Sequence, residues 1–175
     1  MKVYEFGDKI KPVIVLLPGT CCYWKTNFGE VIPLLQEKFR VCVVSYDGFD
    51  ETENTTFPTM LEECAEQFIQ KNGEYGKKFM GLMKGPDGNG MPFVSKKSVA
   101  NQFGSDMVTP LPDKIAPKHG KIHIFYALKM GEQYRERYLQ HFAEPVIHEY
   151  DLRHEELLAC YPEKWVEEVE NACGV

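Results

Sequence analysis

VIVLLPG, residues 13–19, is an uninterrupted apolar run that stops at a Pro-Gly pair. Such a run is typical of a strand that is buried on both faces, as in a parallel sheet covered by helices. A second run of this kind, Arg40–Tyr46 (RVCVVSY), ends at Asp47-Gly48. Between the two runs, Asn27–Phe39 is expected to be a helix, with Pro33 in its first turn or at a kink. A strand, a helix and a strand in this order predict an α/β fold.

The same alternation continues to the end of the chain. Thr59 and Glu62 form a capping box that opens a helix through Gln70, and Asn72-Gly73 is expected to end it. The other expected elements are three strands and two helices: Lys2–Phe6, Lys121–Leu128, Val146–Tyr150, Gln133–Phe142, and a last helix that starts at Pro162 and buries Trp165, Val166 and Val169. We therefore predict a mostly parallel sheet with helices on both faces, in a single domain over residues 1–175.

Residues 73–117 depart from this alternation. Glycine and proline are frequent there, above all in Gly85–Gly90, and the apolar pieces between them are short. This composition predicts a lid-like surface excursion with one or two small helices, one of them at Lys97–Phe103.

Composition excludes several classes of function. The chain carries 20 Lys and Arg against 26 Asp and Glu, so its net charge is -6, and an acidic surface repels the phosphates of nucleic acids. No apolar run reaches the length of a membrane span, and the charged start lacks the layout of a signal peptide. None of the six cysteines forms a CxxC pair. We expect a cytoplasmic protein with free thiols, no nucleic-acid partner and no membrane partner.

Several stretches together resemble the α/β-hydrolase family. VIVLL running into PGTCCYW is similar to the turn that presents backbone N–H groups to an oxyanion, and RVCVVSYDGFDET resembles the neighbouring strand and its loop. KIHIFYALKMGEQYRERY resembles the strand and loop that carry the catalytic acid. VIHEYDLRHEELLACYPEKWVEEV resembles the last strand, the histidine loop and the closing helix. The matching stretches cover about two-thirds of the chain.

The chain departs from this family at the nucleophile. In the family a serine stands on a strained turn of pattern G-x-S-x-G, between a strand and a helix. None of the four serines, Ser45, Ser95, Ser98 and Ser105, has glycines at both flanking positions. The comparison suggests that one or two strand-helix units are missing from the middle. We expect that Val13–Leu17 and Lys121–Leu128 then pair directly through a long crossover.

The resemblance implies roles for five residues. His154 matches the general base, Glu132 or Asp151 the acid that orients it, and Gly19 and Thr20 the oxyanion turn. Each has a structural alternative: His154 as a surface histidine that caps a helix, Glu132 as a solvated carboxylate in a first helical turn, and Gly19-Thr20 as a simple end to a strand.

Other chemistry finds less support in the sequence. Cys21 and Cys22 could replace serine as nucleophiles, but they follow the oxyanion-type turn rather than the elbow strand. His148, Asp151 and His154 have H-x-x-D-x-x-H spacing, which on a strand running into a loop does not put three ligands on one face. We therefore expect no metal and no cofactor. A flavodoxin-like nucleotide binder would need a glycine-rich phosphate loop, which Pro18–Cys22 does not supply.

Three functions remain open from the sequence. The first is a hydrolase that cleaves an ester or amide of a small acyl compound, impaired or inactive because it has no G-x-S-x-G nucleophile. The second is a non-catalytic derivative that keeps a pocket for an acyl or ester ligand, or that assembles as a homodimer. The third is a truncated product of a longer hydrolase gene, whose exposed sheet edges would favour a dimer.

Overall fold

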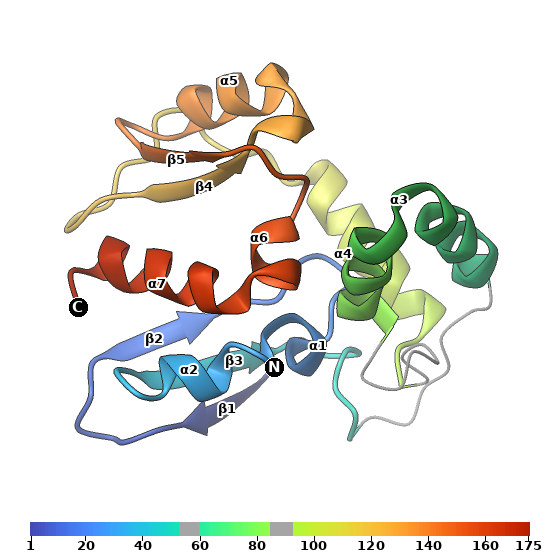
Figure 1. The fold of residues 1–175 in the computed structure, drawn as a ribbon, viewed down its shortest axis with the longest axis horizontal. Helices are drawn as coiled ribbons and strands as arrows, with labels where there is room; N and C mark the ends of the chain where they lie inside the picture. Colours follow the sequence, from blue (N-terminus) through green and yellow to red (C-terminus); the bar gives the residue numbers. More distant parts are fainter. Residues whose placement is uncertain (53–59, 85–92) are drawn as a thin grey trace.

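The computed structural model describes residues 1–52, 60–84 and 93–175 (Figure 1). Five strands and seven α-helices lie within these residues: β1 Lys2–Phe6, β2 Val13–Leu16, α1 Trp24–Phe28, α2 Ile32–Leu35, β3 Arg40–Ser45, α3 Met60–Lys84, α4 Lys96–Val108, β4 His123–Ala127, α5 Glu132–His141, β5 Val146–Tyr150, α6 Glu156–Cys160 and α7 Pro162–Cys173. No helix in this described part of the chain combines the length and the apolar character needed to span a membrane.

The first three strands form a mixed sheet in the order β1-β3-β2. β1 runs antiparallel to β3, with Tyr4 opposite Val43, and β2 runs parallel to β3, with Leu16 also opposite Val43. β3 is therefore the central strand. Its residues alternate between buried and half-buried, so the continuous apolar run from Arg40 does not mark a strand that is buried on both faces.

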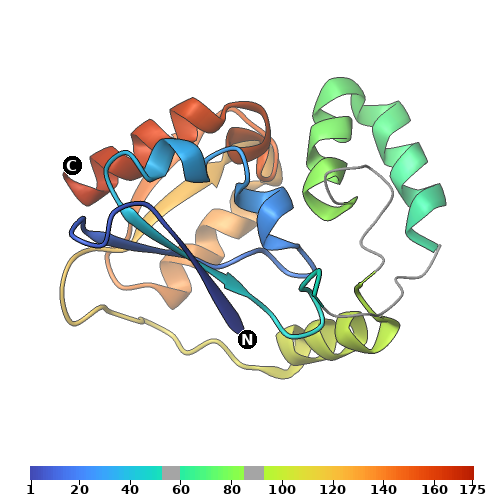
Figure 2. The same ribbon diagram turned by 90° about the horizontal axis from the view of Figure 1, so that it is seen from below.

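The last two strands form a separate parallel sheet. β4 and β5 pair in register from His123 opposite Val146 to Ala127 opposite Tyr150. Helices lie on both sides of this sheet, with α5 above it and α7 below it in Figure 1; Figure 2 gives the view from below, with α7 nearer the viewer than this sheet. On the α5 side, Tyr126 packs edge-on against Tyr138, with ring centroids 6.1 Å apart.

The expected direct pairing of Val13–Leu17 with Lys121–Leu128 is wrong. β2 and β4 belong to different sheets, so the single sheet that we predicted is divided into two. Side chains rather than backbone hydrogen bonds connect the two sheets. Leu16 of β2 and Phe125 of β4 pack into one apolar cluster together with Val166 of α7. Because α7 packs against both strands, β2 and β4 are connected without approaching within hydrogen-bonding distance of each other.

The core lies on one face of the mixed sheet. Val41 and Val43 are completely buried there beneath α1, α2 and α7. Tyr4 of β1 stacks on Trp24 of α1, with ring centroids 4.6 Å apart. In α7, Val166 and Val169 are buried as the sequence predicted, and Pro162 occupies its first turn.

The opposite face of the mixed sheet is largely uncovered. Val3, Val13, Val15 and Leu17 are between 56% and 60% exposed. Their neighbours one residue along β2, Ile14 and Leu16, point to the core, because side chains alternate along a strand. The prediction of helices on both faces therefore holds for the β4–β5 sheet but not for the mixed sheet.

Two helices differ from their sequence predictions. The segment Asn27–Phe39 contains the end of α1 and the whole of α2 rather than one helix. The helix expected to stop at Asn72-Gly73 resumes and runs to Lys84, with Gly73 in a non-helical conformation at the join. The capping residue Thr59 and the glycine-rich piece Gly85–Gly90 lie outside the described residues.

Candidate functional site

The turn after β2 is held by side chains of two helices. The Gly19 N–H donates to Asn27 Oδ1 of α1 at 2.9 Å, and the Cys21 N–H donates to Gln102 Oε1 of α4 at 2.7 Å. Cys22 N–H closes the turn on Gly19 O at 3.0 Å. A turn that serves as an oxyanion hole must direct its N–H groups at a substrate. Here the N–H groups of Gly19, Cys21 and Cys22 already have acceptors inside the protein.

Thr20, the second residue predicted for the oxyanion turn, also faces an internal partner. Its hydroxyl donates to Asp106 Oδ2 of α4 at 2.8 Å. A carboxylate next to this turn opposes the formation of an oxyanion, because like charges repel, although solvent screens this exposed contact. The fold thus forms the predicted turn at Gly19-Thr20 and surrounds it with acceptors.

Glu155, and not its neighbour His154, approaches this turn. Its backbone is left-handed, with φ of 54°, which is uncommon for a residue with a side chain. A methyl group at Gly19 would lie 3.3 Å from Glu155 Oε1 and 3.6 Å from Cys22 Sγ. Burial raises the pKa of Glu155, although the nearby His154 opposes this shift.

His154 is exposed at the end of the loop that follows β5. Its ring lies against Phe79 of α3, with centroids 5.9 Å apart, and its carbonyl oxygen accepts a hydrogen bond from the Tyr75 hydroxyl at 2.9 Å. Within the described residues, no side chain forms a hydrogen bond with the His154 ring.

The two acids predicted to orient His154 face cations instead. Lys129 Nζ lies 3.4 Å from Asp151 Oδ1 and donates to the Asp151 carbonyl at 2.8 Å. Glu132, in the first turn of α5, has Oε1 3.7 Å from Arg135 Nη1. The structure therefore does not assemble His154, Glu132 and Asp151 into a hydrogen-bonded chain.

The two thiols nearest the turn are poor nucleophiles. Burial, followed by the charge of Asp106, raises the pKa of Cys21 to about 11. Burial, followed by the charge of Glu155, raises the pKa of Cys22 to about 12, and the Asn27 amide offsets part of this effect. Cys22 Sγ lies 3.6 Å from the Thr20 carbonyl oxygen, a contact that suits a protonated thiol acting as donor.

Two of the four serines, Ser45 and Ser95, have structural roles. Ser45 ends β3, is buried, and donates to the Phe49 carbonyl at 3.4 Å. Ser95 caps α4 by accepting the Ser98 N–H at 3.0 Å. Neither arrangement resembles an exposed hydroxyl on a strained turn between a strand and a helix.

Two adjoining pockets flank His154 at the carboxyl ends of β4 and β5. The larger, of about 590 Å³, presents the cationic side chains of Lys129 and Arg153, together with His154, Tyr75 and Tyr134. The smaller, of about 230 Å³, shares His154 and Arg153 with it and is otherwise mainly apolar: Phe125, Ala127, Met130, Tyr138, Tyr150, Leu152, Leu157, Leu158 and Trp165, with Glu155 at one side. Ligands of open α/β sheets commonly bind at this end of the strands.

Sequence reasoning missed Asn27, Gln102 and Glu155. Asn27 and Gln102 lie on helices whose sequences carry no motif, and their role depends on how the helices meet the turn. Glu155 is adjacent to the predicted His154, and the sequence did not indicate that the Glu155 side chain approaches the turn after β2. No group of three His, Cys, Asp or Glu side chains within the described ranges is arranged to hold a metal ion.

Comparison with known proteins agrees with this description at the level of the fold. No protein-family model matches the chain, and no curated protein matches it significantly. The fold is similar to the crystal structure of a protein from Desulfitobacterium hafniense provisionally described as an alpha/beta hydrolase family protein. The TM-score is 0.65 over 98% of this chain and 100% of that one, with 11% sequence identity.

The class of protein defined by these observations is an α/β protein with an α/β-hydrolase-like fold. The resemblance read from the sequence is thereby confirmed for the fold. At 11% identity the similarity carries no information about activity.

Proposed function

We propose that this chain is an α/β-hydrolase-like protein that holds a small acyl or ester compound without hydrolysing it. The observation that carries the proposal is the turn after β2, where Gly19 and Cys21 donate their N–H groups to protein side chains. A single oxyanion donor contributes about 3 kcal/mol to acyl transfer in enzymes that use one. Donors that are already bonded cannot contribute this without breaking their own bonds.

The protonation state of the thiols supports the same conclusion. With a pKa of about 12, the Cys22 thiol is ionised at neutral pH in a fraction on the order of one molecule in 100,000. The carboxylate of Glu155 disfavours the Cys22 thiolate further, because both side chains lie against Gly19 and like charges repel.

The mainly apolar pocket beside His154 supports ligand binding. Phe125, Tyr150 and Trp165 provide aromatic walls for an acyl chain, and Arg153 and His154 stand at its polar side. Such a lining, apolar with a few polar groups, is typical of small-molecule sites.

Mass spectrometry with a fluorophosphonate probe tests the absence of catalysis. The intact mass of the protein is expected to stay unchanged after incubation at pH 7.5. Hydrolysis of p-nitrophenyl butyrate is expected to be equal for the wild type and for His154→Ala. An adduct that disappears in Ser45→Ala, or a rate that falls in His154→Ala, would overturn the proposal.

The fluorescence of Trp165 tests ligand binding. Butyranilide, an amide with a short acyl chain, is expected to change the emission of the wild type in a saturable way. Trp165→Phe should remove this response, whereas Trp24→Phe should retain it, because Trp24 lies beneath the mixed sheet. Saturation that is unchanged by Trp165→Phe, or no saturation at all, would refute binding in this pocket.

A further inference from the structure

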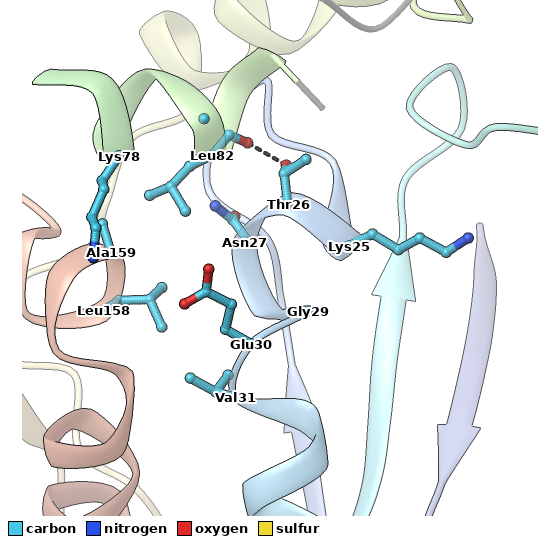
Figure 3. A pocket seen from close by; sticks show the side chains of 11 residues that line it. Lys25, Thr26, Asn27, Gly29, Glu30, Val31, Lys78, Leu82, Leu158 and Ala159 are labelled. Atoms are coloured by element: carbon cyan, nitrogen blue, oxygen red, sulfur yellow. Dashed lines mark hydrogen bonds between the residues drawn. The ribbon is translucent and has the colours of Figure 1, made fainter. Parts of the chain in front are cut away.

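Another pocket, distinct from the two that flank His154, lies where α1, α3 and α6 meet (Figure 3). Its volume is about 370 Å³, within the range of small-molecule sites. The helices that form it are in contact, since α3 packs on both α1 and α6. Leu82, Leu158, Ala159 and Val31 give it an apolar wall.

Asn27 presents an unused hydrogen-bond donor to this pocket. Only 4% of the residue is exposed, and among the described residues its Nδ2 has no hydrogen-bond partner apart from the approach to the Cys22 thiol. The Gly19 N–H fixes the orientation of the amide, because it requires Oδ1 at that position and so turns Nδ2 the other way. Figure 3 shows the amide nitrogen directed into the space between Leu82 and Leu158.

An unpaired buried donor of this kind destabilises the folded protein, because it has lost its hydrogen bonds to water. The Cys22 thiol, which the Asn27 amide also approaches, is only a weak acceptor. A ligand oxygen in the pocket would satisfy Nδ2 and recover this free energy.

Two opposite charges line the same pocket. Lys78 of α3 and Glu30, which follows α1, both contribute to the lining. Neither forms an ion pair with any described residue. Lys25, the other cation near the pocket, points away from it and pairs with Glu51 (Figure 3).

We propose that this pocket binds a small aliphatic α-amino acid such as leucine. The ligand carboxylate accepts from Asn27 Nδ2 and pairs with Lys78, the ammonium group pairs with Glu30, and the aliphatic side chain packs on Leu82 and Leu158. A simple carboxylate would leave Glu30 facing a like charge, and a simple amine would leave Asn27 Nδ2 unsatisfied. The proposal is independent of the function proposed for the pocket beside His154.

Isothermal titration calorimetry of the full chain with three ligands tests this assignment. L-leucine is expected to bind with one-to-one stoichiometry, at least tenfold more tightly than 4-methylpentanoate, which lacks the amine, or 3-methylbutylamine, which lacks the carboxylate. Equal affinities for the three compounds, or no heat from any of them, would overturn the proposal.

Variants of Glu30 and Lys78, both of them exposed, test which charged group of the ligand each side chain binds. Glu30→Gln is expected to weaken leucine at least fivefold and to leave 4-methylpentanoate unaffected or slightly improved. Lys78→Gln should weaken leucine similarly and leave 3-methylbutylamine unaffected. Lys77→Gln and Glu37→Gln are matched controls, because both residues are exposed and neither lines the pocket. Identical effects of the test and control variants would refute the placement.

Asn27→Asp tests the donor while keeping the fold. The carboxylate can still accept the Gly19 N–H, but it cannot donate to the ligand. Leucine affinity is expected to fall at least tenfold while the thermal unfolding transition stays cooperative. Unchanged leucine affinity in this variant would contradict the role of Nδ2.

Discussion

Asp50 is the buried carboxylate on which the loop after β3 depends. Its side chain is 1% exposed and accepts four hydrogen bonds, from the Tyr4 hydroxyl at 2.8 Å, Lys2 Nζ at 3.0 Å, Thr52 N at 3.0 Å and Thr52 Oγ1 at 2.6 Å. Two of these donors lie on β1. The carboxylate therefore ties the first strand of the sheet to the end of the central strand.

Asp50→Asn is expected to lower the free energy of unfolding by about 3 kcal/mol at pH 7. A hydrogen bond to a charged group contributes about 1.5–3 kcal/mol, and the amide keeps the bonds of its oxygen but loses the charge that strengthens them. Its Nδ2 also replaces the oxygen that accepts from Tyr4, whose hydroxyl must then rotate. Lys2 is half exposed and can regain water, which keeps the loss at the lower end of the range for buried ion pairs.

The pH dependence has a definite sign. Burial alone would raise the pKa of Asp50, but hydrogen bonds from Thr52 and Tyr4 outweigh it and hold the pKa well below its usual range. A folded pKa below that of the unfolded chain, about 3.9, gives stability that is complete above that value. This stability is lost as the pH falls toward the folded pKa. The difference between wild type and Asp50→Asn should therefore be constant from about pH 5 to 7 and narrow below about pH 4.

Urea unfolding followed by circular dichroism measures this difference. Asp47→Asn is the control, because Asp47 is 80% exposed and pairs only with the chain terminus, so its loss should cost less than about 1 kcal/mol. Equal destabilisation by the two variants at pH 7, or a difference that widens on acidification, would refute the reasoning.

Three further outcomes follow from the packing. Gly48→Ala should destabilise the protein by about 2 kcal/mol in thermal unfolding, because φ is 82° and the new Cβ would lie 2.0 Å from Ser98 Oγ; an unchanged midpoint would contradict this. Iodoacetamide at pH 8 should label exposed Cys173 well before Cys22, whose pKa is about 12; peptide mapping that finds the reverse order would be inconsistent with the burial of Cys22. Val15→Lys should shift size-exclusion elution toward the monomer at high concentration, because Val15 is 57% exposed on the uncovered face; a wild type that is monomeric throughout would refute self-association.

The strands could be predicted because their signal is local. Arg40–Tyr46 is predicted from an apolar run and Val146–Tyr150 from the alternation of strands and helices, and the structure has β3 at Arg40–Ser45 and β5 at Val146–Tyr150. Gly73 was recognised as a break, and it does leave the helical conformation, with φ of 58° and ψ of -132°. The sequence could not show that the helix resumes afterwards, since this depends on the contacts of α3 with α1 and α6.

The sheet pairing and the site were beyond local patterns. Whether β2 meets β4 is decided by α7, which joins the core more than 140 residues after β2. The sequence predicts His154 as the base because of the chemistry of histidine. In the structure, the left-handed backbone of Glu155 turns the carboxylate of that residue, and not the His154 ring, toward Gly19. A backbone conformation of this kind has no signature in a single sequence, because only glycine adopts it readily.

One feature of the architecture relates the turn after β2, whose N–H groups are bonded within the protein, to the uncovered face of the mixed sheet. Within the described residues, neither β2 nor β4 has a strand on the edge that faces the other sheet. In α/β sheets the catalytic groups gather at the carboxyl ends of central strands, so this is the place where a nucleophile would stand. The helix that follows such a strand would also cover a face of the sheet, where Val13 and Val15 are now exposed.

Under the function proposed above, activity would require a whole strand-turn-helix unit and not one hydroxyl. We expect that Cys22→Ser hydrolyses p-nitrophenyl butyrate no faster than the wild type, because the serine would inherit the buried position of Cys22 beside Glu155, and Gly19 would still donate its N–H to Asn27. Cys173→Ser is the matched control at an exposed thiol. A rate in Cys22→Ser that exceeds this control and disappears when His154 is also changed to alanine would show that a working triad needs less of the sheet than we infer.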